Sequence, residues 1–330
     1  MKKTILSSIL KASVSLLFIV ILLYAMREKY DQILATLKGT NVALFGLGAL
    51  VFLSSSLAAS LRLKLIVQAE DAARIKFSEV VSLTLVGYFF NNFLPTSIGG
   101  DIVKAYYLSK KTRDKMASYT SVFVDRALGL FTMIFMAVAA LLFVGSRVID
   151  PTTQRAIYII AAVSIAGIIF MMNKNFAMRF AFLLRLFGPL GMKLKEAYNA
   201  IHKFRKHKAL MIKSLAISVV SQLVYFSSIG VIAVSIGLRI PVLDILLRMP
   251  IVSAMSLLPS INGLGLREGS TVLLYGPLVG KENAFALSIL LLALLFLISI
   301  LGGLIYVISP QFKVRLKVLE KEEEKLENDR

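Results

Sequence analysis

Two short stretches of the sequence combine proline, glycine, small polar residues and charge within long apolar surroundings. The first is NNFLPTSIGGD, residues 91–101, and the second is LLPSINGLGLRE, residues 257–268. Such residues are rare in membrane helices, because each leaves a backbone group unpaired or brings a charge into hydrocarbon. Glycine-rich turns that lead into a helix, with a charged side chain beside them, are typical of anion-binding sites. We therefore expect the two stretches to form a substrate-binding site.

The candidate residues of the first stretch surround the expected start of a helix. Asp101 follows two glycines, so its carboxylate can cap free N–H groups and complement the positive end of the helix. Lys104 lies three residues further on, on the same helix face. Helix capping is also the alternative, purely structural role for Asp101. The predicted binding residues here are Asn92, Ser97, Gly99, Gly100, Asp101 and Lys104.

The second stretch carries an arginine followed by a glutamate in place of the aspartate. A guanidinium at membrane depth is costly unless it faces a partner or a wet cavity, and it can bind phosphate through two hydrogen bonds. The alternative is a closed ion pair between Arg267 and either Asp101 or Glu268. The predicted binding residues here are Ser260, Asn262, Gly263, Gly265, Arg267 and Glu268.

Two further charges, Asp125 and Arg126, lie within an apolar block and complete the set of candidate binding residues. Adjacent residues point apart on a helix, so each needs a partner on a neighbouring element. We expect contact with the first stretch. The alternative for Arg126 is that its side chain extends to the membrane surface.

The elements that must position these residues are membrane helices. The chain has 330 residues, 57% of them hydrophobic, and the apolar residues lie in long blocks. Its solvent is therefore mostly lipid, and we expect a multi-pass protein of the cell membrane. Full-length spans, each of roughly 20 residues, are predicted at 9–26, 42–61, 118–144, 156–172, 215–236 and 284–309.

Two segments, 78–108 and 243–279, are apolar on both sides of a Pro/Gly break, with arms of about 10 to 17 residues that are short for crossing alone. Each is predicted to be a re-entrant hairpin; a spanning first arm followed by a surface helix is the alternative. If both segments return to the side they came from, 28 of the 38 Lys and Arg residues share one face with both termini. Basic loops face the cytoplasm, so this arrangement is favoured and both termini are expected to be cytoplasmic.

The predicted fold is an all-α polytopic membrane protein with about six transmembrane helices and two re-entrant broken-helix hairpins, arranged as two inverted repeats. Residues 1–172 hold the first membrane half, whose hairpin is entered from the cytoplasm, and the helix from 156 begins the second half. Residues 214–309 complete the second half, whose hairpin is entered from outside. Broken helices at matching positions of inverted repeats indicate a transporter site near the midplane, whereas packing kinks are the alternative.

Residues 173–213 are predicted to be a basic cytoplasmic linker, and residues 310–330 a charged cytoplasmic tail. Apolar residues recur in the linker at steps of three and four among lysines, as in a helix on an anionic bilayer surface: Leu194, Tyr198, Ile201 and Phe204. A role limited to setting topology is the alternative, and a protein partner could also dock there.

Several classes of function are excluded or disfavoured. The chain has no cysteine, and its two histidines, His202 and His207, have no carboxylates clustered around them, so no metal site is predicted. No Walker loop, HExxH or GxSxG motif occurs, so we expect no cofactor, no catalytic residue and no ATP-driven pump. The net charge of +19 is explained by membrane topology, and no nucleic-acid partner is expected.

Three motifs in order resemble a known family. They are N-x-L-P-x-x-x-G-G-D at residues 92–101, D-R-x-x-G-L at 125–130, and L-P-S-x-x-G-x-G-x-R-E at 258–268. Together they resemble the flippase-like family built on the membrane domain of lysylphosphatidylglycerol synthases, over residues 5–309. Two departures are Lys104, where relatives tend to have arginine, and the Ser-Ile-Asn at 260–262.

The resemblance implies a stand-alone membrane domain that moves a phospholipid or a polyprenyl-linked lipid between leaflets, without the aminoacyl-transfer domain of the fused synthases. The partners expected are therefore membrane lipids, either anionic phospholipid or lipid linked to polyprenyl phosphate. One alternative is a membrane-embedded transferase or hydrolase acting on a lipid phosphate. Another is a membrane partner subunit of a lipid or glycan synthesis enzyme.

Overall fold

The computed structural model describes Val20, Tyr24 and residues 26–70, 75–93, 99–112, 114–144, 151–172, 208–256 and 263–309. Within these residues every regular element is helical, which confirms the all-α prediction. The helices are η1 (Arg27–Lys29), α2 (Tyr30–Lys38), α3 (Val42–Glu70), α4 (Phe77–Phe93), α5 (Gly99–Ser109), α6 (Lys115–Val144), α7 (Pro151–Met172), α11 (Lys208–Ser235), α12 (Val242–Met255), α13 (Leu266–Val279) and α14 (Lys281–Ile308).

Four of these helices, α3, α6, α11 and α14, are long and apolar enough to cross a membrane. They coincide with the predicted spans 42–61, 118–144, 215–236 and 284–309. The protein is therefore a membrane protein with several apolar helices.

The other two predicted spans stay predictions. The first, 9–26, lies outside the described residues except at three positions. The second, 156–172, falls in α7, where the described side chains form only the shorter apolar stretch Gln154–Val163. The interfacial helix predicted in the linker and the charged tail at 310–330 also lie outside the described residues.

The boundary predicted at residue 61 is wrong, because α3 continues to Glu70. Arg62, the residue directly after the predicted span, therefore lies inside the helix, and its side chain is buried. The helix can continue past this charge because a carboxylate on α6 neutralises it, as described below. Similarly, α11 begins at Lys208, within the range predicted for the linker.

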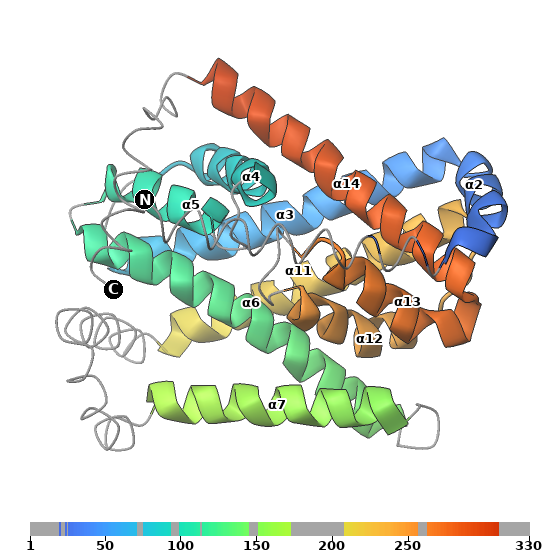
Figure 1. The fold of residues 1–330 in the computed structure, drawn as a ribbon. Coiled ribbons are helices and arrows are strands. Elements are labelled where there is room, and N and C mark those ends of the chain that lie inside the picture. The colour runs from blue at the N-terminus through green and yellow to red at the C-terminus, as the bar shows by residue number, and fades with distance from the viewer. Residues whose placement is uncertain are drawn as a thin grey trace, which may run out of the picture.

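Helices α3 and α11 lie side by side at the centre of the molecule (Figure 1). Their contacts pair early positions of α3 with late positions of α11, so the two helices run antiparallel. The hydroxyl of Ser228 donates to the Gly48 carbonyl at 2.9 Å, and that of Ser221 donates to the Ser55 carbonyl at 3.0 Å. Small residues of this kind let two membrane helices approach closely.

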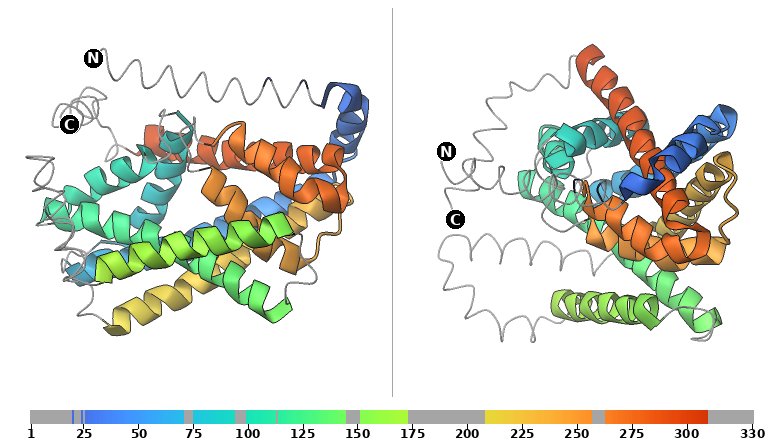
Figure 2. Two further views of the ribbon diagram at one scale, coloured as in Figure 1. Left: turned by 60° about the horizontal axis from the view of Figure 1, so that its bottom comes forward. Right: turned by 45° about the vertical axis from the view of Figure 1, so that its right-hand side comes forward.

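The remaining helices cover this central pair on two sides. Helix α14 lies on one side and packs on α4, while α6 lies on the other and packs on α12 (Figure 1). Helix α5 also packs on α6, and α13 packs on α14. Helix α7 lies along the outside of α6, as Figure 2 shows from two other directions.

Close packing around α4 depends on two glycines. A methyl group at Gly302 of α14 would collide with the carbonyl oxygen of Leu85 in α4, and one at Gly100 of α5 would collide with that of Gly87. Both neighbours are backbone atoms, which cannot rotate away as a side chain can. Helix α4 is therefore held against both α5 and α14 at backbone distance.

Candidate functional site

The start of α5 is fixed by hydrogen bonds and by the glycine contact with α4. The Gly100 N–H donates to the side-chain oxygen of Asn91 at 2.7 Å, which satisfies one of the unpaired donors of the helix start. The amide of Asn92 donates to the Leu295 carbonyl of α14 at 3.3 Å. These contacts set the position of Asp101 in the first turn of α5.

Asp101 forms ion pairs with two cations. The ammonium group of Lys104 lies 2.6 Å from one of its carboxylate oxygens, and the guanidinium of Arg126, on α6, pairs with the other. The side chains of Asp101 and Lys104 are 12% and 14% exposed, while that of Arg126 is 26% exposed. The side chain of Arg126 is thus more exposed than that of Lys104.

A second ion pair joins α3 to α6. The Nε of Arg62 donates to the carboxylate of Asp125 at 2.6 Å, and one Nη of Arg62 donates to the hydroxyl of Ser218 on α11 at 2.6 Å. Both charged side chains are buried, at 7% and 11% exposure. Gly129 of α6 faces the guanidinium, and a methyl group there would lie 3.3 Å from its Nη atoms. One arginine therefore links the three helices.

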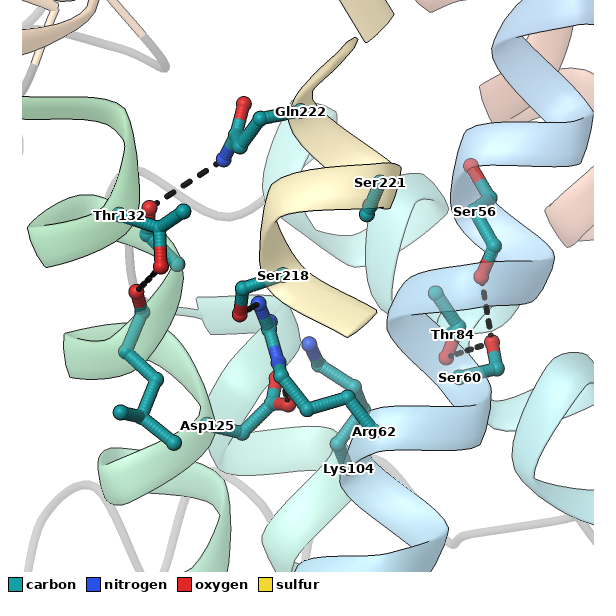
Figure 3. Close-up of polar contacts among 12 residues, drawn as sticks. Ser56, Ser60, Arg62, Thr84, Lys104, Asp125, Thr132, Ser218, Ser221 and Gln222 are labelled. Atoms are coloured by element: carbon teal, nitrogen blue, oxygen red, sulfur yellow. Dashed lines mark hydrogen bonds and ion pairs between the residues drawn. The ribbon is translucent and has the colours of Figure 1, made fainter. Parts of the chain in front are cut away.

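The two ion-pair groups form one cluster. Lys104 interacts electrostatically with both Asp101 and Asp125, and Figure 3 shows its side chain beside the Arg62–Asp125 pair. We call this set the charge cluster; it consists of three cations and two carboxylates, Arg62, Lys104, Arg126, Asp101 and Asp125. Counted over these five described residues, the charge cluster carries one excess positive charge.

Two buried hydroxyls lie next to the charge cluster on matching helix faces. Ser121 is one helical turn before Asp125 on α6, and Ser214 is one turn before Ser218 on α11. Neither hydroxyl has a hydrogen-bond partner among the described residues, and both serines are 0% exposed. A buried hydroxyl without a partner costs free energy, so both are available as donors to a ligand or to water.

The second stretch forms a closed contact of its own at the start of α13. The guanidinium of Arg267 pairs with Glu268 at 2.7 Å, and the other carboxylate oxygen of Glu268 accepts the Gly265 N–H at 2.7 Å. Gly263 and Gly265 both have positive φ, of 76° and 82°, which only glycine adopts readily. Of the two ion-pair partners considered for Arg267, the structure selects Glu268 and not Asp101.

A line of aromatic side chains lies between the charge cluster and Arg267. Tyr88 of α4 interacts electrostatically with Lys104, and Tyr225 of α11 interacts with both Tyr88 and Arg267. Phe52 of α3 packs against both tyrosine rings, at centroid distances of 5.8 and 5.9 Å. The rings of Tyr88, Phe52 and Tyr225 thus form one aromatic group that joins α4, α3 and α11.

The ends of α4 and α5 that lie far from Asp101 are also joined. Glu79, in the first turn of α4, and Lys111, just after α5, form an ion pair at 2.6 Å outside the four candidate spans. The hydrogen bond from Lys111 lowers the pKa of Glu79 below its ordinary value. The two arms of the predicted segment 78–108 therefore begin and end side by side.

The structure places the predicted site residues in two groups. Four of them meet in the charge cluster, with Gly99, Gly100 and Asn92 beside it, whereas Arg267, Glu268, Gly263 and Gly265 form the separate group at α13. Three predicted residues, Ser97, Ser260 and Asn262, lie outside the described residues.

Sequence reasoning missed Arg62, Ser121, Ser214 and Ser218. The available signal was Asp125, whose carboxylate needed a cation on a neighbouring helix. Arg62 directly follows the predicted span 42–61, so the sequence gives no indication that it lies within a membrane helix and can be that cation.

Comparison with known proteins gives one result. Residues 8–303 match the family model described as "Lysylphosphatidylglycerol synthase TM region". No curated protein and no solved structure matches the chain.

Proposed function

Because the chain belongs to the family of lysylphosphatidylglycerol synthase transmembrane regions, we propose that it moves a lipid with an anionic headgroup between the leaflets of the membrane. The substrate class is a phospholipid or a lipid linked to polyprenyl phosphate. The proposal rests on one observation, the excess positive charge of the buried charge cluster. Excess charge at membrane depth is costly, and a lipid phosphate would neutralise it.

The composition of the charge cluster fits a phosphate better than a metal cation. Its cations outnumber its carboxylates, and the neighbouring hydroxyls of Ser121 and Ser214 can donate hydrogen bonds. A guanidinium can hold a phosphate through two parallel hydrogen bonds. Arg126, the most exposed cation, would bind the headgroup first. Lys104 would bind it next, once its ion pair with Asp101 is released.

We further propose that the two membrane halves are inverted repeats. Helices α3, α4, α5 and α6 begin at Val42, Phe77, Gly99 and Lys115, and α11, α12, α13 and α14 begin at Lys208, Val242, Leu266 and Lys281. Each helix of the second set therefore begins nearly the same number of residues after the helix in the same place of the first set. The helix contacts also match between the two halves: α4 of the first half packs on α14 of the second, and α12 of the second half packs on α6 of the first. Antiparallel contact between α3 and α11 is expected of two elements related by an axis in the membrane plane.

In this arrangement the pairs α4–α5 and α12–α13 are re-entrant hairpins that enter from opposite sides. The headgroup would pass between their inner ends, along Tyr88 and Tyr225, while the lipid tails stay in the bilayer. Asp101 is the third residue of α5 and Glu268 is the third residue of α13, so both helix starts carry a carboxylate at the equivalent position, and in α13 Arg267 precedes it. Both chain termini and the basic linker would lie on the cytoplasmic side of the cell membrane.

The proposal is tested by reconstituting the full chain in liposomes that contain headgroup-labelled phosphatidylglycerol. An impermeant quencher should reach the inner-leaflet label with wild type and with the control Lys110→Gln, whose side chain is exposed. It should reach much less label with Arg126→Gln, and the recovered lipid should be chemically unchanged. Equal quenching in wild-type and empty liposomes would remove the proposal, and a new lipid species would favour an enzyme.

A further inference from the structure

The contact between α6 and α11 contains two buried hydroxyls that take no part in the ion pairs of the charge cluster. They belong to Ser121 and Ser214, which are both 0% exposed, and neither has a hydrogen-bond partner among the described residues. We propose that these two hydroxyls bind one water molecule between the helices. The site itself does not rest on the proposed function, because it depends only on how the two helices pack.

Helices α6 and α11 run parallel, and two contacts fix their register. The amide of Gln222 donates to the Gly129 carbonyl at 3.2 Å. Four residues earlier on each helix, Asp125 and Ser218 both contact the guanidinium of Arg62, each at 2.6 Å (Figure 3). Both contacts therefore have the same register.

The same register places Ser121 opposite Ser214. Ser121 lies four residues before Asp125 on α6. Ser214 lies four residues before Ser218 on α11. A step of four residues keeps a side chain on one face of a helix and moves it about 6 Å along the axis. The two hydroxyls therefore face the same space between the helices, without a direct hydrogen bond to each other.

A hydroxyl in a helix can also be satisfied by the carbonyl four residues earlier. Thr132 on α6 and Ser227 on α11 donate in this way, each at 2.8 Å. Ser121 and Ser214 make no such bond, although both lie within regular helix. Two unpaired buried hydroxyls are costly, and a bound water is the usual partner of such groups in protein interiors.

The neighbours of the two hydroxyls fit one enclosed water. The carboxylate of Asp125 lies one turn from Ser121 on the same face, so it offers an acceptor in addition to the two hydroxyls. A buried water typically makes about three hydrogen bonds. Toward the start of α11, Ile66 packs in an apolar cluster with Leu210 and Met211. This cluster separates the hydroxyls from the helix start, so the water would be a bound one.

A role of this water in lipid transport rests on the proposed function. The water would join the two hydroxyls to Asp125, and a bond through water is nearly as favourable in enthalpy as a direct one. The hydroxyls would then support the charge cluster through the water.

A crystal structure of the full chain in a lipidic mesophase, with other ordered waters resolved, tests the site directly. We expect one water peak within about 2.5–3.0 Å of both hydroxyl oxygens, and no such peak in the double variant Ser121→Ala/Ser214→Ala. Arg126→Gln should keep the peak whatever it does to lipid transport, which separates this proposal from the proposed function. Absence of the peak, hydroxyls bonded to each other or to backbone carbonyls, or a peak of the size of phosphate would overturn the proposal.

Unfolding in mixed detergent micelles provides an independent measurement. Ser121→Ala and Ser214→Ala should each lower the folding equilibrium constant by about three- to tenfold, because each leaves the other hydroxyl poorly satisfied. The double variant should lose no more than either single variant, since it removes both hydroxyls together. The control Ser227→Ala, at an exposed position of α11, should change the constant by less than about threefold. Losses that simply add in the double variant would contradict a shared water.

Discussion

At the scale of single residues, the ion pair between Arg62 and Asp125 decides how the rest of the charge cluster is held. Its atoms are 2.6 Å apart, and Arg62 also contacts Ser218, so three helices depend on one guanidinium. The pair leaves Arg126, the neighbour of Asp125, pointing toward Asp101. A change in the buried pair is therefore expected to disturb the site as well as the fold.

We predict a large energetic coupling within this pair. Arg62→Met or Asp125→Leu alone should lower the free energy of unfolding by about 3–5 kcal/mol, because each leaves a buried charge without its partner. The double variant should recover most of that loss, since two apolar side chains carry no such penalty. Unfolding in mixed detergent micelles measures all three values.

The ion pair Glu79–Lys111 provides the matched control. Its side chains are 24% and 35% exposed, so water screens the attraction. Glu79→Gln should cost no more than about 1 kcal/mol. Equal losses for Asp125→Leu and Glu79→Gln would contradict the assignment of the Arg62–Asp125 pair as a buried structural contact.

At the scale of elements, α4 is placed by backbone contacts with α5 and α14. We predict that Gly100→Ala lowers the free energy of unfolding by about 1–3 kcal/mol, because the added methyl group meets the Gly87 carbonyl. Lipid transport should fall with it, since Asp101 moves with the start of α5.

The control for this substitution is Gly46→Ala in α3. A methyl group there meets nothing within 4 Å, so the change should be neutral or stabilising by up to about 1 kcal/mol through helix propensity. If Gly100→Ala were as stable and as active as Gly46→Ala, close contact between α4 and α5 would not be needed for the site.

The sequence predicted the elements where length and apolar composition decide the outcome. Helices α3, α6, α11 and α14 follow from apolar blocks long enough to cross hydrocarbon. The end of α3 could not be predicted in this way, because Arg62 is neutralised by Asp125, which lies far away in the chain. The sequence analysis also did not predict the ion pair between Arg248 and Asp244 on α12, although a spacing of four residues fits an ion pair on one helix face.

At the scale of the whole molecule, the proposed inverted repeats predict opposite exposure of the two hairpins. The chain has no cysteine, so single cysteines can be introduced into a clean background. Lys110→Cys, beyond α5, should react with an impermeant thiol reagent only from the cytoplasmic side. Leu278→Cys, near the end of α13, should react only from the opposite side. Labelling of both positions from the same side would contradict the inverted arrangement.

The central claim is that the excess positive charge of the charge cluster binds the lipid phosphate. It is tested most directly by removing that charge with one substitution and restoring it with a second. Arg126→Gln makes the charge cluster neutral, and Asp101→Asn added to it restores one excess positive charge with two cations and one carboxylate. In the liposome assay with labelled phosphatidylglycerol, we predict that Arg126→Gln loses at least tenfold in rate and that the double variant regains most of it. A double variant as slow as Arg126→Gln, or an Arg126→Gln protein as fast as wild type, would contradict the account.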